Sequence, residues 1–185
     1  ATFIYVTHDQ VEAMTMADKI AVMDNAKLLQ HGPPADIYDL PTSTMVAGFL
    51  GNPGMNFVSG NFGTKDGKDC FVSSGFHLNL PPGVTRSGDN VTLGIRPESV
   101  LVGELGDGHS VIEGSVFETE PVGSDLFLDI SFGNIAEGHI TEASGLFKVR
   151  ALPDLVTKVG DKVPLSLPHG KIYFFDESGQ RIHPD

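Results

Sequence analysis

His8 is the residue whose type and position most favour chemistry in this chain. It follows the apolar run Phe3 to Val6, which is typical of a buried strand, and it precedes a stretch with helical spacing. Open α/β sheets place ligand-binding groups at this carboxyl end of a strand. A neutral imidazole there can donate a hydrogen bond to a phosphate oxygen and report whether the phosphate is present. The alternative is that His8 only satisfies a backbone carbonyl at the strand end.

Other catalytic motifs are missing from the sequence. Gly67-Lys68 and Gly170-Lys171 lack the upstream glycine and the following serine or threonine of a phosphate-binding P-loop. No GxSxG elbow, HExxH helix or EF-hand loop is present. Residue chemistry alone therefore predicts that this chain is not an enzyme. Two pairs of carboxylates are interpreted as solvated faces rather than acid/base pairs, Glu118 with Glu120 and Asp36 with Asp39.

The residues that commonly bind metals show no recognisable spacing. Cys70 is the single cysteine, which excludes an internal disulfide and a multi-cysteine metal site, and we expect it to be a small core residue. No two histidines are three or four positions apart, so the sequence predicts no metal site. The seven histidines are His8, His31, His77, His109, His139, His169 and His183.

Composition narrows the class of protein. The 185 residues include 12 basic and 24 acidic side chains, and the net charge of -12 disfavours nucleic acid and anionic lipid as partners. The 22 glycines and 12 prolines favour many short strands over long helices. No apolar run approaches the ~20 residues of a membrane span, so we expect no direct membrane insertion. Because Ala1 opens directly into a strand pattern, we expect the chain to have been cut from a longer one.

The first fifty residues combine strand and helix patterns. Asp9 with Glu12 resembles a capping box, and apolar residues at helical spacing follow it. The other elements predicted here are a hairpin over Ile20 to Leu29, a helical turn opened by Pro33-Pro34 through Tyr38, and a second helix capped by Thr42 or Ser43 and reaching Leu50.

Gly51-Asn52-Pro53-Gly54 is the best domain boundary, because a helix ends before it and the hydrophobic period changes from 3.6 to 2 after it. Short alternating strands separated by turn residues favour a small barrel or sandwich. The candidate strands are Asn56 to Asn61, Cys70 to Ser73, Phe76 to Leu80, Val91 to Ile95, Ser110 to Glu118, Leu126 to Phe132, Glu137 to Thr141, Val163 to Leu167 and Lys171 to Phe175.

One sequence pattern occurs twice in this second part. Thr85 to Ile95 matches Thr157 to Leu167, since both have a Gly-Asp turn before an amphipathic strand, and a proline follows each copy. One interpretation is a common turn used twice. The other is a pair of related half-barrels, and two copies do not decide between them.

Several segments carry a resemblance to a known family. The longest is TFIYVTHDQVEAMTMADKIAVM at Thr2 to Met23. Further matching segments are Gln30 to Pro34, Ile37 to Pro41, Val46 to Pro53, Met55 to Phe57, LGIRPE at Leu93 to Glu98, and FFDESG at Phe174 to Gly179. Together they closely resemble the last part of the ATP-binding subunit of carbohydrate-importing ABC transporters of the maltose, multiple-sugar and glycerol-3-phosphate type.

This resemblance implies a division of the chain at Gly51. Residues 1–51 are then an α/β remnant of a nucleotide-binding domain, and residues 52–185 a mainly β, OB-like regulatory domain. It also makes His8 the switch histidine that contacts the γ-phosphate of ATP between two subunits. Arg96 and Glu98 are expected either to form an ion pair that holds a turn of the barrel or to be solvent-exposed charges.

The family's P-loop, Q-loop, LSGGQ-type motif and magnesium-binding strand are expected to lie before Ala1. The resemblance therefore implies ATP and magnesium as cofactors of the whole subunit, an ABC-type ATPase, and none for this chain alone. The implied partners are a second copy, the membrane permease subunits and a regulatory protein, and the implied location is the cytoplasmic side of the cell membrane, held peripherally by the permeases. Because the Phe3 to Val6 strand has then lost the neighbouring strands of its sheet, we expect it to be partly disordered or to pair with another copy.

Two other classes of function remain as alternatives. One is a small-ligand module, since related barrels in oxyanion transporters bind anions, although the net charge and only four arginines disfavour it. The other is an OB-fold nucleic-acid binder, which is disfavoured because the chain has no tryptophan and only 3 tyrosines for base stacking.

Overall fold

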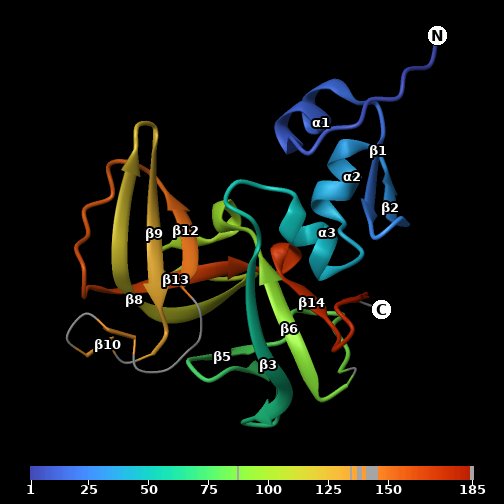
Figure 1. The fold of residues 1–185 in the computed structure, drawn as a ribbon. Helices are drawn as coiled ribbons and strands as arrows, with labels where there is room; N and C mark the ends of the chain where they lie inside the picture. Colours follow the sequence, from blue (N-terminus) through green and yellow to red (C-terminus); the bar gives the residue numbers. More distant parts are fainter. Residues whose placement is uncertain (87, 134, 137–138, 141–145, 184–185) are drawn as a thin grey trace.

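Two parts of different architecture make up the chain, which we describe from a computed structural model. The structure describes residues 1–86, 88–133, 135–136, 139–140 and 146–183. Figure 1 shows a small α/β segment at the N-terminal end beside a larger body of strands that extends to the C-terminus. The expectation of a mainly β chain preceded by a short α/β segment is confirmed.

The N-terminal segment contains the predicted helices and hairpin. Asp9 accepts hydrogen bonds from the backbone N–H groups of Val11 and Glu12 and so caps the first helix. Pro34 opens the second helix, and Ser43 caps the third. The elements are α1 (Gln10–Met16), β1 (Ile20–Asp24), β2 (Lys27–Gly32), α2 (Pro34–Asp39) and α3 (Thr44–Phe49).

The hairpin β1–β2 forms the base of a small core. Asn25 and Ala26 at its turn both have positive φ, which matches the twist of the strands they join. One face of the hairpin then packs against the helices. The buried residues of this core are Ile20, Val22, Ile37, Val46 and Leu50.

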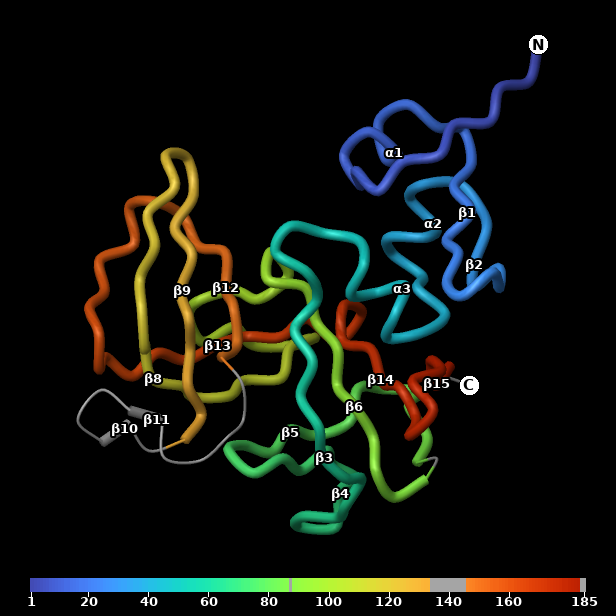
Figure 2. Tube along the Cα trace, in the orientation of Figure 1, coloured from blue at the N-terminus to red at the C-terminus, as the bar shows by residue number. Residues whose placement is uncertain are grey.

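The predicted strand at Phe3 to Val6 is wrong for this structure. Residues 1–7 have no regular secondary structure, and Phe3, Ile4 and Val6 are 89%, 91% and 90% exposed. No described strand lies beside them to accept their backbone hydrogen bonds or cover their side chains. Figure 2 shows this end of the chain extending away from both sheets.

The body consists of two packed sheets. The five-stranded sheet has the order β12 (Phe147–Ala151), β9 (Asp125–Ser131), β8 (His109–Val122), β13 (Lys162–Pro168) and β7 (Leu101–Val102). The six-stranded sheet has the order β15 (Arg181–Ile182), β14 (Tyr173–Phe175), β6 (Asn90–Ile95), β3 (Asn56–Lys65), β4 (Lys68–Val72) and β5 (His77–Asn79). A separate hairpin pairs β10 (Ile135–Ala136) with β11 (His139–Ile140).

The two sheets repeat one plan, which supports the half-barrel interpretation of the duplicated pattern. The matching segments form β6 and β13, and each strand leads into a 3₁₀ helix, η1 (Pro97–Ser99) or η2 (His169–Lys171). The chain then crosses over, so that β7 pairs with β13 and β14 pairs with β6. Each half therefore contributes the strand that follows its 3₁₀ helix to the sheet of the other.

Polar side chains join the two sheets in the same reciprocal way. The Asn56 amide donates to the Lys148 carbonyl over 2.7 Å and accepts from the Lys148 N–H over 2.8 Å. At the equivalent edge, the Ser110 hydroxyl donates to the Asn79 carbonyl over 3.4 Å. One apolar core fills the space between the sheets, and its fully buried members include Phe71, Leu93, Leu128, Leu165 and Phe174.

Most predicted strands are present, and several are longer or shorter than expected. The strand β3 continues to Lys65, and β8 runs from His109 to Val122. The expected strand at Lys171 begins only at Tyr173, because a 3₁₀ turn precedes it. The strands β7, β10, β12 and β15 were not predicted. The expected strand Glu137 to Thr141 falls largely outside the described residues.

Candidate functional site

The His8 turn is held by its neighbours while its own side chain is exposed. The Thr7 hydroxyl accepts a hydrogen bond from the Asp9 N–H over 2.9 Å and donates one to the Glu12 carboxylate over 2.9 Å. Glu12 thus closes the capping box through Thr7 rather than through the Asp9 backbone. The Glu12 charge, with a hydrogen bond from the Tyr5 hydroxyl, raises the pKa of that phenol. These contacts fix the backbone at His8 and leave the imidazole free.

His8 is the only predicted phosphate-binding group in this region. The described residues around it include no glycine-rich loop that cradles phosphate and no carboxylate pair suited to magnesium. One imidazole presents a single hydrogen bond to a phosphate. The residues present therefore fit one contact to ATP and do not fit a complete MgATP site.

A side chain of α1 connects the His8 turn to the boundary between the two parts. The Gln10 side-chain oxygen accepts a hydrogen bond from the Gly51 N–H over 2.6 Å. Gln10 lies two positions after His8, and Gly51 is the first residue of the predicted boundary. One side-chain hydrogen bond therefore joins the start of α1 directly to the boundary.

The other side of the boundary is held by Arg96, which comes from the end of β6 in the sheet body. Its side chain is almost fully buried, with the residue 4% exposed. One guanidinium nitrogen donates to the Leu50 carbonyl over 2.5 Å, and another donates to the Tyr38 carbonyl over 2.8 Å. The guanidinium also stacks on the Tyr38 ring, 3.6 Å from its centre, a cation–π contact.

The expected ion pair between Arg96 and Glu98 is wrong. No salt bridge joins them among the described residues. Each contacts Tyr38 instead, because the Tyr38 ring covers Arg96 and the Tyr38 hydroxyl donates to Glu98. The alternative of two solvent-exposed charges is also wrong for Arg96, which is buried. Burial, followed by the hydrogen bond to Glu98, raises the pKa of Tyr38 to about 12.

Further contacts make the boundary a continuous interface. The Tyr173 hydroxyl donates to the Asp39 carbonyl over 2.8 Å, and the Lys171 ammonium lies 3.2 Å from the Asp39 carboxylate. The Thr44 N–H donates to the Gly179 carbonyl over 2.8 Å. A small apolar cluster formed by Ala47, Met55, Tyr173 and Phe175 joins α3 to β14. The two parts are therefore packed together rather than joined only by a linker.

The remaining candidates from the sequence do not converge on a metal. The described residues contain no group of three or more His, Cys, Asp or Glu side chains able to hold a metal ion. His77, His109 and His169 do line one groove of about 270 Å³. Cys70 is fully buried, as predicted. The two carboxylate pairs at Glu118/Glu120 and Asp36/Asp39 are exposed, as expected of solvated faces.

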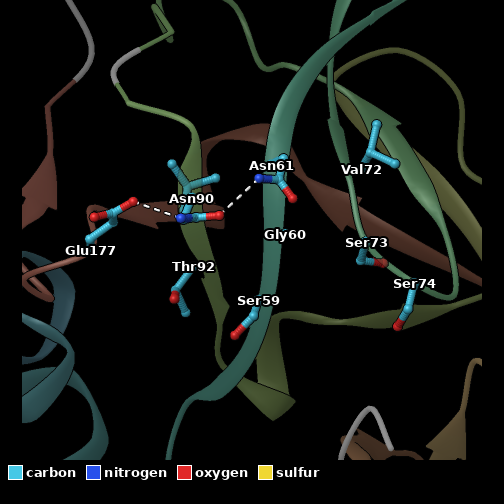
Figure 3. A pocket seen from close by; sticks show the side chains of 10 residues that line it. Ser59, Gly60, Asn61, Val72, Ser73, Ser74, Asn90, Thr92 and Glu177 are labelled. Carbon is cyan, nitrogen blue, oxygen red and sulfur yellow. Dashed lines mark hydrogen bonds between the residues drawn. The ribbon is translucent and has the colours of Figure 1, made fainter. Parts of the chain in front are cut away.

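A second groove, of about 470 Å³, opens on the outer face of the six-stranded sheet (Figure 3). Asn90 donates to Glu177 over 2.7 Å and accepts from Asn61 over 3.0 Å, so these three side chains form a connected row (Figure 3). The described residues that line it include hydroxyls, amides and one carboxylate, and no lysine or arginine. This groove does not suit an anion, because it offers no cation to balance the charge.

Sequence reasoning missed the roles of Gln10 and Tyr38 and assigned Arg96 the wrong partner. The true partners of Arg96 lie 46 and 58 positions away along the chain, so no local pattern identifies them. The available signal was the position of all three residues within segments that matched the family. That signal marked the segments without showing which contacts they make.

Comparisons with known proteins identify a family. Residues 51–100 match the MalK OB fold domain. Xylose/arabinose import ATP-binding protein XacK of Haloferax volcanii is 38% identical over 98% of this chain and 46% of its own length. The sn-glycerol-3-phosphate import ATP-binding protein UgpC 2 of Agrobacterium fabrum is 40% identical over 100% and 46%. The maltose/maltodextrin import ATP-binding protein MalK of Aliivibrio fischeri is 34% identical over 100% and 49%.

The chain spans about half the length of the curated relatives it matches. Among solved structures, the molybdate-binding protein ModG with molybdate bound covers 64% of this chain at 13% identity, with a TM-score of 0.47. That likeness is too low to support a conclusion about fold or ligand. No helix in the described part of the chain is long and apolar enough to cross a membrane.

Proposed function

Because the chain belongs to the family of ATP-binding subunits of sugar-importing ABC transporters, we propose that it is the C-terminal regulatory and dimerisation portion of such a subunit. The whole subunit couples ATP binding and hydrolysis to the import of a sugar or a sugar-like solute. The observation that carries this proposal is the length of the match, which includes both the His8 turn and the two-sheet body in one alignment.

Residues 1–51 and 52–185 have different roles in this proposal. The first range is part of the nucleotide-binding domain, and the second is the OB-like regulatory domain. The boundary lies where Gln10 and Arg96 meet the peptide groups of Leu50 and Gly51. The extensive contacts across it support a regulatory domain whose position is transmitted to the nucleotide-binding domain.

His8 contacts the γ-phosphate of ATP in the whole subunit. Its exposed imidazole at the start of α1, on a backbone fixed by Thr7 and Asp9, supports this role. The bound nucleotide and magnesium supply the phosphoryl group and the charge that holds it. This chain supplies the imidazole and the backbone turn that carries it, while the other contacts to MgATP belong to the rest of the subunit.

The proposed partners follow from the same family. Two subunits pair, and the pair binds the permease subunits at the inner face of the cell membrane. A regulatory protein is a further proposed partner of the OB-like domain. We favour these partners over the oxyanion-binding alternative, because the larger groove in the described body lacks basic side chains.

The test of the proposed function is ATP hydrolysis by the complete subunit. His8→Ala is expected to lower turnover by about 100-fold, because one group that stabilises the transferred phosphoryl group is lost. The matched control is His31→Ala, which removes another exposed histidine of the same segment and leaves turnover unchanged. Equal turnover in wild type and His8→Ala contradicts the proposal. Calorimetry of the 185-residue chain with MgATP is expected to show no binding.

A further inference from the structure

Two consecutive residues at the boundary are held from opposite parts of the molecule. The Leu50 carbonyl accepts from Arg96, which belongs to the sheet body, over 2.5 Å. The Gly51 N–H donates to Gln10, which belongs to the His8 segment, over 2.6 Å. The carbonyl of Leu50 and the N–H of Gly51 belong to one planar peptide group. A displacement of Arg96 therefore tilts the donor that holds Gln10.

The local geometry leaves this peptide group little freedom. Gly51 has a φ of +114°, a conformation that other residues rarely adopt. A Cβ added to Gly51 would lie 3.0 Å from both the Arg96 guanidinium and the Pro53 carbonyl oxygen, which adds close contacts to the strain of the positive φ. Arg96 is also held against α2 of the N-terminal segment by its hydrogen bond to the Tyr38 carbonyl and by stacking on the Tyr38 ring. Its guanidinium is therefore fixed on the N-terminal side of the boundary, while its backbone belongs to the end of β6 in the body, so that a displacement of β6 pulls on the peptide through this side chain.

Only a short stretch of chain separates Gln10 from His8. Gln10 is the first residue of α1, and Asp9 caps that helix through the N–H groups of Val11 and Glu12. The only residue between His8 and Gln10 is Asp9. A shift of Gln10 therefore moves the N-terminus of α1 and the adjoining His8 backbone together.

We infer that Gln10 and Arg96 clamp the Leu50–Gly51 peptide from its two sides, so that Gln10 positions the His8 turn according to the position of the OB-like body. This inference rests on the proposed function in treating His8 as the phosphate-contacting group. Gln10 is a positioning residue in this arrangement, since it acts through the backbone and touches no phosphate. Regulation of the body then reaches the ATP site by a path through this one peptide group.

The first test removes the acceptor on the His8 side. Gln10→Ala in the 185-residue chain is expected to raise the exchange rate of the Gly51 amide about tenfold, the usual effect of one lost hydrogen bond, and to shift the His8 ring signals in NMR spectra. Gln10→Glu keeps a side-chain oxygen that accepts from Gly51, and it is expected to restore both readouts. Gln30→Ala is the matched control, because Gln30 bonds Leu40 and Thr42 within the same segment and makes no contact in the clamp.

The second test asks whether Arg96 acts through Gln10. Arg96→Lys loses the hydrogen bonds to the Leu50 and Tyr38 carbonyls. With Gln10 present, it is expected to raise the amide exchange rates of Val11 and Glu12 about threefold or more. In the Gln10→Ala background it is expected to have no such effect. An effect of equal size in both backgrounds overturns the inference. If Arg96→Lys does not fold, the Gln10 variants decide, because Gln10 belongs to none of the three apolar clusters of the described residues. Unchanged Gly51 exchange and unchanged His8 signals in Gln10→Ala then overturn it.

Neither of these two tests uses nucleotide, so the clamp and the proposed function can be refuted independently of each other. Exchange and NMR signals that do not respond to Gln10→Ala refute the clamp and leave the role of His8 in place. A His8→Ala subunit with normal ATP turnover refutes the proposed function, while the response of Gly51 to Gln10→Ala still demonstrates the mechanical connection.

Discussion

Residues 1–19 and the two-sheet body contain similar apolar runs that end in different environments. The run Phe3 to Val6 is exposed and has no strand beside it among the described residues. The run Tyr173–Phe175 is buried, because β6 and β15 flank it and the opposite sheet covers one face. A strand-like composition therefore produces a strand only where a neighbouring strand supplies backbone hydrogen bonds and other elements bury the side chains. The body supplies its own neighbours by exchanging β7 and β14 between its halves.

The largest expected difference between the two regions comes from removing one aromatic ring from each. Phe174→Ala is expected to lower the free energy of unfolding by about 3–5 kcal/mol, because Phe174 is 2% exposed and packs against Phe62 and Phe71. Phe3→Ala is expected to change it by less than about 0.5 kcal/mol, because its ring is 89% exposed. Urea unfolding followed by circular dichroism measures both. Similar effects of the two variants would contradict the comparison.

A smaller effect is expected from adding one methyl group to the packed sheets. A Cβ at Gly114 would run into Ile130 and Phe132, so Gly114→Ala is expected to cost about 1–3 kcal/mol of stability by overpacking. Gly106→Ala is the control, since nothing lies within 4 Å of a Cβ at that position. The same urea titration applies, and equal midpoints for the two variants would show that the core between the sheets is not tightly packed.

Alkaline pH is expected to weaken the boundary between the two regions. Unfolded tyrosine loses its proton near pH 10, whereas folded Tyr38 keeps its proton to about pH 12, so the free energy of unfolding decreases as the pH rises through that interval. The loss stays below about 3 kcal/mol, because Tyr38 is only partly buried. Tyr38→Phe is expected to reduce this slope in urea titrations at pH 9 and pH 11.5. An identical pH dependence of the free energy of unfolding in wild type and variant would show that Tyr38 does not cause it.

The smallest expected effects come from removing each of two contacts to Asp39. Lys171→Ala removes a half-exposed ion pair with Asp39 and is expected to cost at most about 0.5 kcal/mol. Tyr173→Phe removes the hydroxyl that bonds the Asp39 carbonyl and is expected to cost about 1 kcal/mol. The two midpoints are compared in the same urea series, and the reverse order would indicate that charge rather than hydrogen bonding holds this boundary.

Local signals explain the parts of the fold that could be predicted. Helix caps at Asp9 and Ser43, and the proline at the start of α2, each act within a few residues, so the sequence carries them directly. The alternation of Phe147, Val149 and Ala151 was also available and predicts β12, although it was missed. The duplicated pattern pointed to two halves, and the crossing of the strands that follow their 3₁₀ helices became clear only in the structure.

The candidate site could be predicted only in part, because its main contacts are distant in sequence. His8 was identified from its place after an apolar run, yet that run is not a strand here. Arg96 and Glu98 are two positions apart and have opposite charges, which suggests an ion pair. Arg96 instead stacks on the Tyr38 ring and donates to the Leu50 and Tyr38 carbonyls. These contacts compensate part of the cost of burying its charge, since its Nε has no hydrogen-bond partner among the described residues.

Amide hydrogen exchange of residues 3–6, compared between this chain and the complete subunit, tests the central claim most directly. In the proposed complete subunit, Phe3 to Val6 form a strand in a sheet of the nucleotide-binding domain, while the two-sheet body needs no such partner. We therefore expect fast exchange of residues 3–6 in the monomeric 185-residue chain, slowing by about 100-fold or more in the subunit, with the exchange of β6 and β13 unchanged. Slow exchange of residues 3–6 in the monomeric chain, or equally fast exchange in the subunit, would contradict it.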